Sequence, residues 1–323
     1  MIPPEDFIKN IFTTFDGSAI NEFRAFLENN RGVKKWMIAA DYCIHDTNRP
    51  NNAYAFTIIP YDAYPDQLKQ EINASLPKDL KKTKKIDEAA RDFLNHPRRF
   101  HIGFVLQGDP AVFNNGDDTP PLTVARQSVA ATLAWAEEMG RSSEAIRKLK
   151  LLKQESLANR FNHKLLADLY VLSYLFAFVS VLLARERHID IVGWFSDRDR
   201  MTTWCEGVIW NLGTETVYGI AQRLNIPFPE GMPIVAIPVL GASENPMWFD
   251  EFIRLPDYIA GILAAWDFST NQLPMSGQNK YLRLAEDVVA DSENMIVIKI
   301  RYDSVMNASR IKTSKTPPVA PVN

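Results

Sequence analysis

Residues 188–204 read HIDIVGWFSDRDRMTTW, and this stretch decides how the rest of the chain is interpreted. Ile189–Phe195 is a short run of β-branched, aromatic and other apolar residues, a pattern typical of a buried strand. Two acids alternate with two bases directly after it: Asp197, Arg198, Asp199 and Arg200. Ligands of open α/β sheets bind at the carboxyl ends of the strands, so these side chains are candidates for a site. The alternative is a polar turn in which Asp197 or Asp199 caps the helix predicted from Thr202.

The composition indicates a soluble globular protein. Of its 323 residues, 46% are hydrophobic and 23% are charged, and the formal net charge is −3. Overall charge therefore does not favour nucleic-acid binding, which would need local basic patches. The two cysteines, Cys43 and Cys205, form no zinc-type spacing, and we expect them to be core thiols in a reducing cytoplasm. The first residues, MIPPEDFIKN, lack the basic start and apolar block of a signal peptide.

One segment is apolar enough to raise the question of a membrane. Leu169–Ala184 carries no charge, and Asp168 and Arg185 bound it. It is slightly short for a bilayer span, so we predict a buried core helix and no stable membrane insertion.

Strands are predicted before and after this helix. The predicted strands are Lys35–Ile44, Ala53–Tyr61, Arg99–Gln107, Ile189–Phe195, Pro233–Leu240 and Asn294–Tyr302. The first two should pair antiparallel, and the prolines at 233 and 238 place the fifth at a sheet edge. Helices are predicted at 4–30 in two pieces, 86–95, 122–140, 142–154, 157–187, 202–223 in two pieces, and 247–266, with Pro256 as a kink or restart.

The chain is predicted to form one domain over residues 1–311, with N-terminal helices and an inserted helical region at about 109–156. The Pro-rich tail, residues 312–323, is expected to be disordered.

The order of these elements predicts an RNase H-like mixed sheet in the α/β class. Without the inserted helices, three antiparallel strands come first and helices then alternate with strands, which is the order of that fold. Asp41 lies in the first strand, Asp197 follows the fourth, and Asp257 lies on the helix after the fifth. In such a fold these three positions converge at one end of the central strands and hold divalent metal.

Three motifs carry a family resemblance. They are AADYCI around Asp41, GWFSDRDRMT around Asp197 and Asp199, and RLPDYIAGILAAW around Asp257. With them the chain, over roughly residues 35–267, resembles the RNase H-like proteins of the domain-of-unknown-function 3800 family. The most specific match is Leu255–Gly261. The family pattern commonly has Asp-Glu-Ser/Thr after the first strand, whereas Tyr42 and Cys43 follow Asp41 here.

The resemblance implies a metal-dependent nuclease or a related phosphoryl-transfer enzyme acting on nucleic acid. Mg²⁺ or Mn²⁺ would be bound by oxygen ligands, with Asp41 bridging and Asp197, Asp199 and Asp257 completing the set. Arg198, Arg200 and Lys280 could neutralise phosphate. Asp168 and Glu155 are candidates for a fourth carboxylate.

Structural interpretations compete with these roles. An ion pair with Arg198 or Arg200 would satisfy Asp41, which is costly to bury unpaired. Asp257 could be a helix cap or a first-turn acid. His45 could be a ligand or general base, or simply a residue of a polar turn. The Lys78–Lys85 run and Arg98-Arg99 could follow a phosphate backbone, or form a solvated surface.

Two other functions stay open. One is a catalytically inactive RNase H-like protein that binds a partner. The other is a nucleotide-sugar transferase in which Asp197-x-Asp199 holds Mn²⁺ on a diphosphate. The absence of P-loop, GxGxxG, Gly-x-Ser-x-Gly and HExxH motifs disfavours ATPases, dehydrogenases, the corresponding esterases and zincins.

Overall fold

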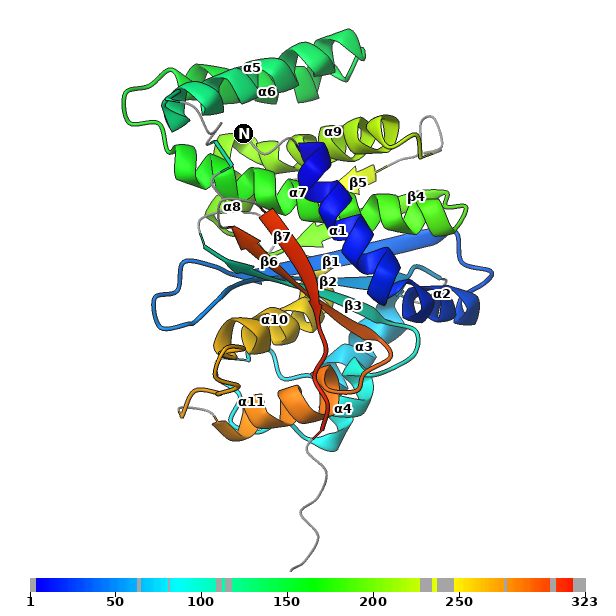
Figure 1. Ribbon diagram of the computed structural model, residues 1–323. Coiled ribbons are helices and arrows are strands. Elements are labelled where there is room, and N and C mark those ends of the chain that lie inside the picture. The colour runs from blue at the N-terminus through cyan, green and yellow to red at the C-terminus, as the bar shows by residue number, and fades with distance from the viewer. Residues whose placement is uncertain are drawn as a thin grey trace, which may run out of the picture.

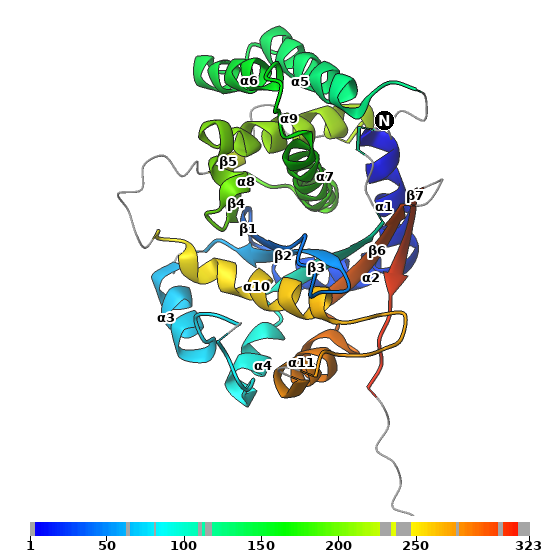
Figure 2. The ribbon, with the colours of Figure 1, turned by 90° about the vertical axis from the view of Figure 1, so that its left-hand side faces the viewer.

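A computed structural model shows one mixed sheet covered by helices on both faces (Figures 1 and 2). The structure describes residues 4–62, 65–80, 82–108, 112–113, 118–226, 234–236, 247–275, 278–302 and 306–315. The strands are β1 Lys35–Cys43, β2 Asn52–Pro60, β3 Phe100–Gln107, β4 Ile191–Ser196, β5 Ile234–Ala236, β6 Met295–Tyr302 and β7 Met306–Ile311. They lie in the order β5-β4-β1-β2-β3-β6-β7. The α/β class and the mixed sheet predicted from the sequence are confirmed.

The directions of the strands follow from their connections. β1, β2 and β3 pair antiparallel in sequence order, as short connections allow. β4 pairs parallel to β1 and β5 parallel to β4, after long helical crossovers. On the far side β6 pairs parallel to β3, and β7 pairs antiparallel to β6. The edge position predicted for the fifth strand is confirmed, although Pro233 and Pro238 lie outside the described residues.

The helices form two layers and an outer pair. On one face lie α1 Pro4–Ser18, α2 Ile20–Asn29, α7 His163–Glu186, α8 Arg200–Thr203 and α9 Val208–Arg223. On the other face lie α3 Pro65–Ser75, α4 Glu88–Leu94, α10 Asp250–Ala265 and α11 Gln278–Leu284. The outer pair, α5 Pro121–Glu138 and α6 Ser143–Ser156, packs over α7 and α9 (Figure 2).

Successive side chains of β1 point to opposite faces of the sheet and pack into two separate cores. Trp36, Ile38 and Ala40 belong to the core on the α7 face, whereas Met37 and Ala39 belong to the core on the α10 face. Both faces of the strand are therefore buried, as its apolar sequence predicts.

α7 is apolar all round because it is covered on all sides. By length and composition alone it could cross a membrane, but 89% of its most apolar window is buried against the sheet, α9 and the outer helices. The core-helix prediction is confirmed for this segment. The helix begins later than predicted: Asn162 caps it through Leu165 N, so residues 157–162 are not part of it.

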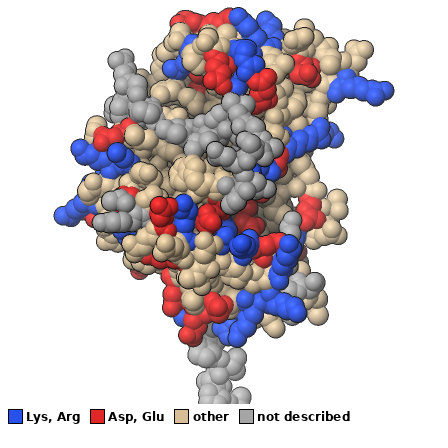
Figure 3. All heavy atoms as spheres, turned by 180° about the vertical axis from the view of Figure 1, so that it is seen from behind, with Lys and Arg blue, Asp and Glu red and all other residues tan. Residues whose placement is uncertain are grey.

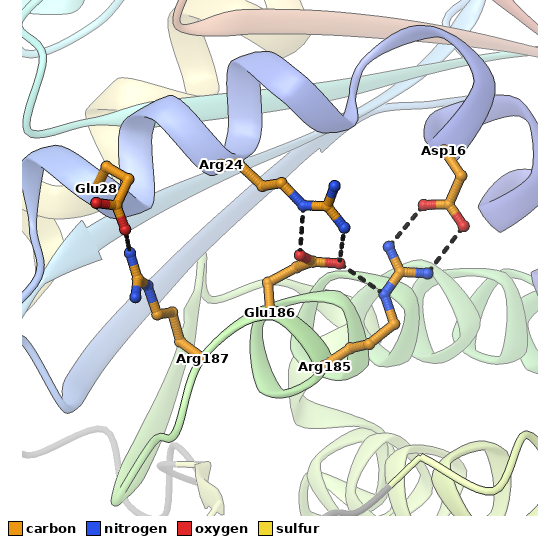
Figure 4. A network of polar contacts seen from close by, with 6 residues as sticks. All are labelled: Asp16, Arg24, Glu28, Arg185, Glu186 and Arg187. Carbon is orange, nitrogen blue, oxygen red and sulfur yellow. Dashed lines mark hydrogen bonds and ion pairs between the residues drawn. The ribbon is translucent and has the colours of Figure 1, made fainter.

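An ionic network fastens the N-terminal helices to the end of α7 (Figure 4). Arg185 donates to both oxygens of Asp16 at 2.9 and 2.6 Å. Arg24 donates to Glu186 at 2.8 Å, and Arg187 pairs with Glu28. Most of these side chains are partly exposed, so each pair contributes little to stability alone. Together they fix the orientation of α1 and α2 at that end of the sheet.

Several predicted boundaries are wrong. Two elements were not predicted: α3, which is mostly polar, and β7. The two helical pieces predicted at 202–223 are present, but the division between them lies at Cys205, Glu206 and Gly207, which all have positive φ. α10 continues as one helix through Pro256, so the restart considered there is wrong. In the predicted tail, Lys315 N donates to Asp291 at 2.9 Å, and residues 316–323 lie outside the described part.

Two glycines on α9 provide a test of how β4 is held. A Cβ on Gly213 would lie 2.3 Å from Trp194, whose ring stacks on Phe176 at 4.1 Å and cannot easily move. We expect Gly213→Ala to lower the free energy of unfolding by about 1–3 kcal/mol, as overpacking does.

Gly219→Ala on the same helix is the matched control. Nothing lies within 4 Å of its added methyl group, so a gain of about 0.5–1 kcal/mol is expected from helix propensity. Urea unfolding of both variants measures the difference. Equal effects would show that α9 does not pack on Trp194 as described.

Candidate functional site

Asp41 lies near the end of β1, on the sheet face covered by α10. It has the same alternation as Met37 and Ala39, whose side chains enter the core on that face. Its Oδ1 accepts the backbone N–H of Tyr42 at 2.8 Å. The residue keeps some exposure to solvent, although protein atoms surround its carboxyl group.

Asp197 follows β4 at the same level of the sheet. The parallel register pairs Ala40 with Ser196, so the next residues along, Asp41 and Asp197, are neighbours across the two strands. Phe195 enters the core on the α10 face, and Asp197 has the same alternation. Asp197 Oδ1 accepts the backbone N–H of Arg198 at 2.7 Å.

Asp257 reaches this region from α10, which packs across β1, β2 and β3. Of the charged groups near Asp41, Asp257 has the largest effect on its pKa. α10 begins at Asp250, so Asp257 lies two turns inside the helix, and its interpretation as a cap or first-turn acid is wrong.

Burial and like charges dominate the electrostatics here. Burial raises the pKa of Asp41 well above its ordinary value, and the carboxylates of Asp257, Asp197 and Asp199 raise it further. Asp197 is exposed as a residue, but nearby protein atoms partly desolvate its carboxyl group and raise its pKa, with contributions from Asp199 and Asp250. The predicted ion pair between Asp41 and Arg198 or Arg200 is not found among the described residues. Arg198 instead pairs with Asp250 at 3.2 Å.

Asp199 has a structural role. Its Oδ1 accepts the backbone N–H groups of Met201 and Thr202 at 2.8 and 3.0 Å, and so caps α8. The capping role considered for this turn is therefore confirmed for Asp199, while its charge still acts on Asp41.

The two candidates for a fourth carboxylate lie elsewhere. Asp168 is on α7, across the sheet from α10, and both its oxygens lie 3.0 Å from His45 Nε2. Glu155 is on α6; burial, with the charges of Glu155 and Glu206, raises the pKa of Cys205 to about 12. Neither shares the α10 face with Asp41.

Asp250 is the acid that sequence reasoning missed. It precedes Asp257 by seven residues, two helical turns, so both lie on one face of α10. This seven-residue spacing is the feature of the sequence that could have identified Asp250 as part of the site. Asp250 Oδ2 accepts from Arg198 and, at 2.9 Å, from Met247 N.

Cations border the acids. Lys280 on α11 is 6% exposed, and its Nζ donates to Leu80 O at 2.6 Å. Burial and the positive charge of Arg49 lower the pKa of Lys280, whereas Asp79 and Asp257 act in the opposite direction. Arg49 donates to Tyr281 Oη at 2.8 Å, and Arg200 is exposed at the start of α8. Positive groups thus flank the acidic group.

The donor chemistry suits a hard divalent cation. The acids supply carboxylate oxygens, which Mg²⁺ and Mn²⁺ prefer, and their mutual repulsion would be relieved by positive charge. Within the described ranges, no three His, Cys, Asp or Glu side chains are already grouped closely enough to hold a metal. A bound cation would therefore have to draw these side chains together.

We compared the chain with known protein families, curated proteins and solved structures. No protein-family model, curated protein or solved structure matches this chain.

Because Asp41 has a raised pKa in the folded state, we expect the stability of the protein to depend on pH. A raised folded-state pKa means that the folded state holds its proton more tightly, so stability falls as pH rises through the unfolded-state value. Asp41→Asn removes this loss of stability at high pH, because asparagine carries no charge. Its side-chain oxygen can still accept the backbone N–H of Tyr42. In metal-free buffer we expect the variant to exceed wild type by about 1–3 kcal/mol at pH 7, the usual cost of an unsatisfied buried polar group. The difference should vanish below the ordinary pKa of an aspartate.

Urea unfolding at pH 7 and pH 3 measures both differences. Asp190→Asn is the control, because Asp190 is exposed just before β4, and a change within about 0.5 kcal/mol is expected. A variant no more stable than wild type at pH 7 would contradict the assigned repulsion.

Proposed function

We propose that this protein has an RNase H-like fold and acts as a divalent-metal-dependent nuclease or related phosphoryl-transfer enzyme. The strand order supports the fold. The central strands run β3-β2-β1-β4-β5, the first three antiparallel and the last two parallel to β1. That arrangement is the one expected for an RNase H-like sheet, with β6 and β7 added beyond β3.

The observation that carries the proposed activity is that three acids from separate elements lie near one another at one end of the sheet, although they are not already grouped as a metal site. Asp41 comes from the central strand, Asp197 from the end of its parallel neighbour, and Asp257 from the helix packed over both. They approach one another at the end of the sheet where α/β proteins bind ligands. No cation pairs with Asp41 within the described part of the chain, so no ion pair there offsets the cost of burying its charge.

Each acid has a distinct place in the proposed chemistry. Asp41 on the central strand β1, together with Asp197 and Asp257, would hold the ions through carboxylate oxygens. Bound Mg²⁺ or Mn²⁺ would activate water and neutralise charge on the phosphate. Asp250 holds Arg198 at 3.2 Å and so positions that guanidinium beside Asp197. Asp199 maintains the turn by capping α8 and adds its negative charge to the site.

The substrate would be held by local cations rather than by a broad basic surface. On the face shown in Figure 3, Lys and Arg are interspersed with Asp and Glu. Arg198 and Arg200 follow β4, and Arg49 and Lys280 lie beside Tyr281, so cations border the acids from two directions. This distribution suits a short stretch of phosphate backbone bound at the acids.

A metal titration tests the proposal. Mn²⁺ at 100 times its Kd should raise the stability of wild type by about 2.7 kcal/mol, because it binds the folded state. Asp41→Asn and Asp257→Asn should abolish this rise and any Mg²⁺-dependent cleavage of single- or double-stranded DNA or RNA. The loss should exceed the roughly 10–100-fold effect of removing an outer-shell partner.

Asp190→Asn again serves as the control and should retain both properties. Mn²⁺ stabilisation without cleavage of any nucleic acid, but with release of a nucleotide from a nucleotide sugar, would favour the transferase alternative. The absence of stabilisation by either metal would instead favour a protein that only binds a partner.

A further inference from the structure

A hollow of about 310 Å³ lies at the opposite end of the sheet from the acids. It is formed where β2 ends, beside α3 and the turn between α4 and β3, which pack together on the α10 face (Figure 2). Asp41 pairs with Ala55, and β2 continues five residues further to Pro60. At about 3.3 Å per residue the two places are roughly 17 Å apart.

Arg99 lies in the wall of this hollow with too few partners. The residue is 4% exposed, yet its Nε has no hydrogen-bond acceptor. Nη1 donates to Phe93 O at 2.6 Å, and the guanidinium lies 3.5 Å from the centre of the Phe93 ring. The nearest carboxylate, Glu71, is 3.9 Å away, beyond hydrogen-bonding distance. A buried guanidinium normally has close, paired acceptors, because an uncompensated buried charge is costly.

A second cation lines the same hollow. Arg98 pairs with Asp62, and about half of each side chain is exposed. His96 Nδ1 accepts the backbone N–H of Arg98 at 3.2 Å. Burial and the two arginines lower the pKa of His96, against the opposing effect of Glu71. Asp62 and Glu71 also line the hollow and balance the two arginines in formal charge, so it is the unsatisfied Nε of Arg99 that points to an anion.

Apolar side chains form the rest of the wall. Ile59, Pro60 and Leu68 line it next to the charged groups. The volume exceeds that of an oxyanion and is at the lower limit for small-molecule sites. A ligand with one anionic end and a small organic part would match both the charged wall and the apolar wall of the hollow.

We propose that this hollow binds the phosphate group of a small phosphorylated molecule, with the Arg99 guanidinium as the principal donor. Two guanidinium groups match a doubly charged phosphate better than a carboxylate, and the planar fork of arginine suits its oxygens. Glu71 competes with the ligand for Arg99. The organic part lies against Ile59, Pro60 and Leu68. The site is independent of the proposed nuclease centre.

Inorganic phosphate in metal-free, chelator-containing buffer is the probe, with chloride holding ionic strength constant. Phosphate should raise the melting temperature of wild type in a saturable manner. Glu71→Gln, at an exposed position, should tighten phosphate binding several-fold by removing the competitor. Arg98→Gln and Arg99→Lys should each weaken it roughly tenfold, the effect of losing one charge-assisted hydrogen bond. The signals of the His96 ring in NMR spectra should shift with the same dissociation constant.

Arg91→Gln is the control, because Arg91 lies on α4 and pairs with its neighbour Asp92. It should bind phosphate as wild type does. The proposal is overturned if neither wild type nor Glu71→Gln shows saturable binding, or if Arg98→Gln and Arg99→Lys bind as tightly as wild type. Acetate binding as tightly as phosphate would overturn the choice of phosphate. None of these outcomes depends on whether the protein cleaves nucleic acid.

Discussion

The in-register parallel pairing of β4 with β1 is the constraint on which the candidate site depends. It places Asp197 level with Asp41, and a shift of one residue would turn Asp197 to the other face of the sheet. Packing on the α7 face holds this register. Trp194 stacks on Phe176 at 4.1 Å and meets Trp210 edge-on at 4.9 Å, while Gly213 lets α9 approach its ring closely. Aromatic pairs of this kind contribute about 0.5–1.5 kcal/mol each beyond the area they bury.

On the α10 face of the sheet, close packing at glycines likewise positions Asp257. Gly103 on β3 and Gly261 on α10 leave room for the side chains of Leu263 and Leu80, so α10 lies close to the sheet and α3 region. Asp257 is carried on that helix. The apolar packing of α10 thus offsets the repulsion that arises when its carboxylate approaches Asp41. Sites that gather like charges commonly lower stability for the sake of function.

Within the described residues, Asp41 at one end of the sheet has no cation paired with it, and Arg99 at the other end has an Nε without an acceptor. The acids at the end of β1 are suited to a cation, and the guanidinium of Arg99 near the end of β2 is suited to an anion. In contrast, the ionic network between α1, α2 and α7 is complete, as each acid has a base beside it (Figure 4). The contrast separates charges that stabilise the fold from those that point to a ligand.

Apolar periodicity was enough to predict the strands through β4, β6, the long core helix and α10, because burial demands apolar side chains at regular spacing. It was not enough for α3, which buries only Ile72, or for β7, whose side chains are mostly partly exposed. Asp41, Asp197 and Asp257 could be picked out as acids beside apolar runs. The pairings of other charged residues could not be predicted: Arg198 pairs with Asp250, and Asp168, a candidate for a fourth carboxylate, pairs with His45 across the sheet from α10. Those pairings depend on which faces of distant elements meet, and only the packed tertiary structure brings these faces together.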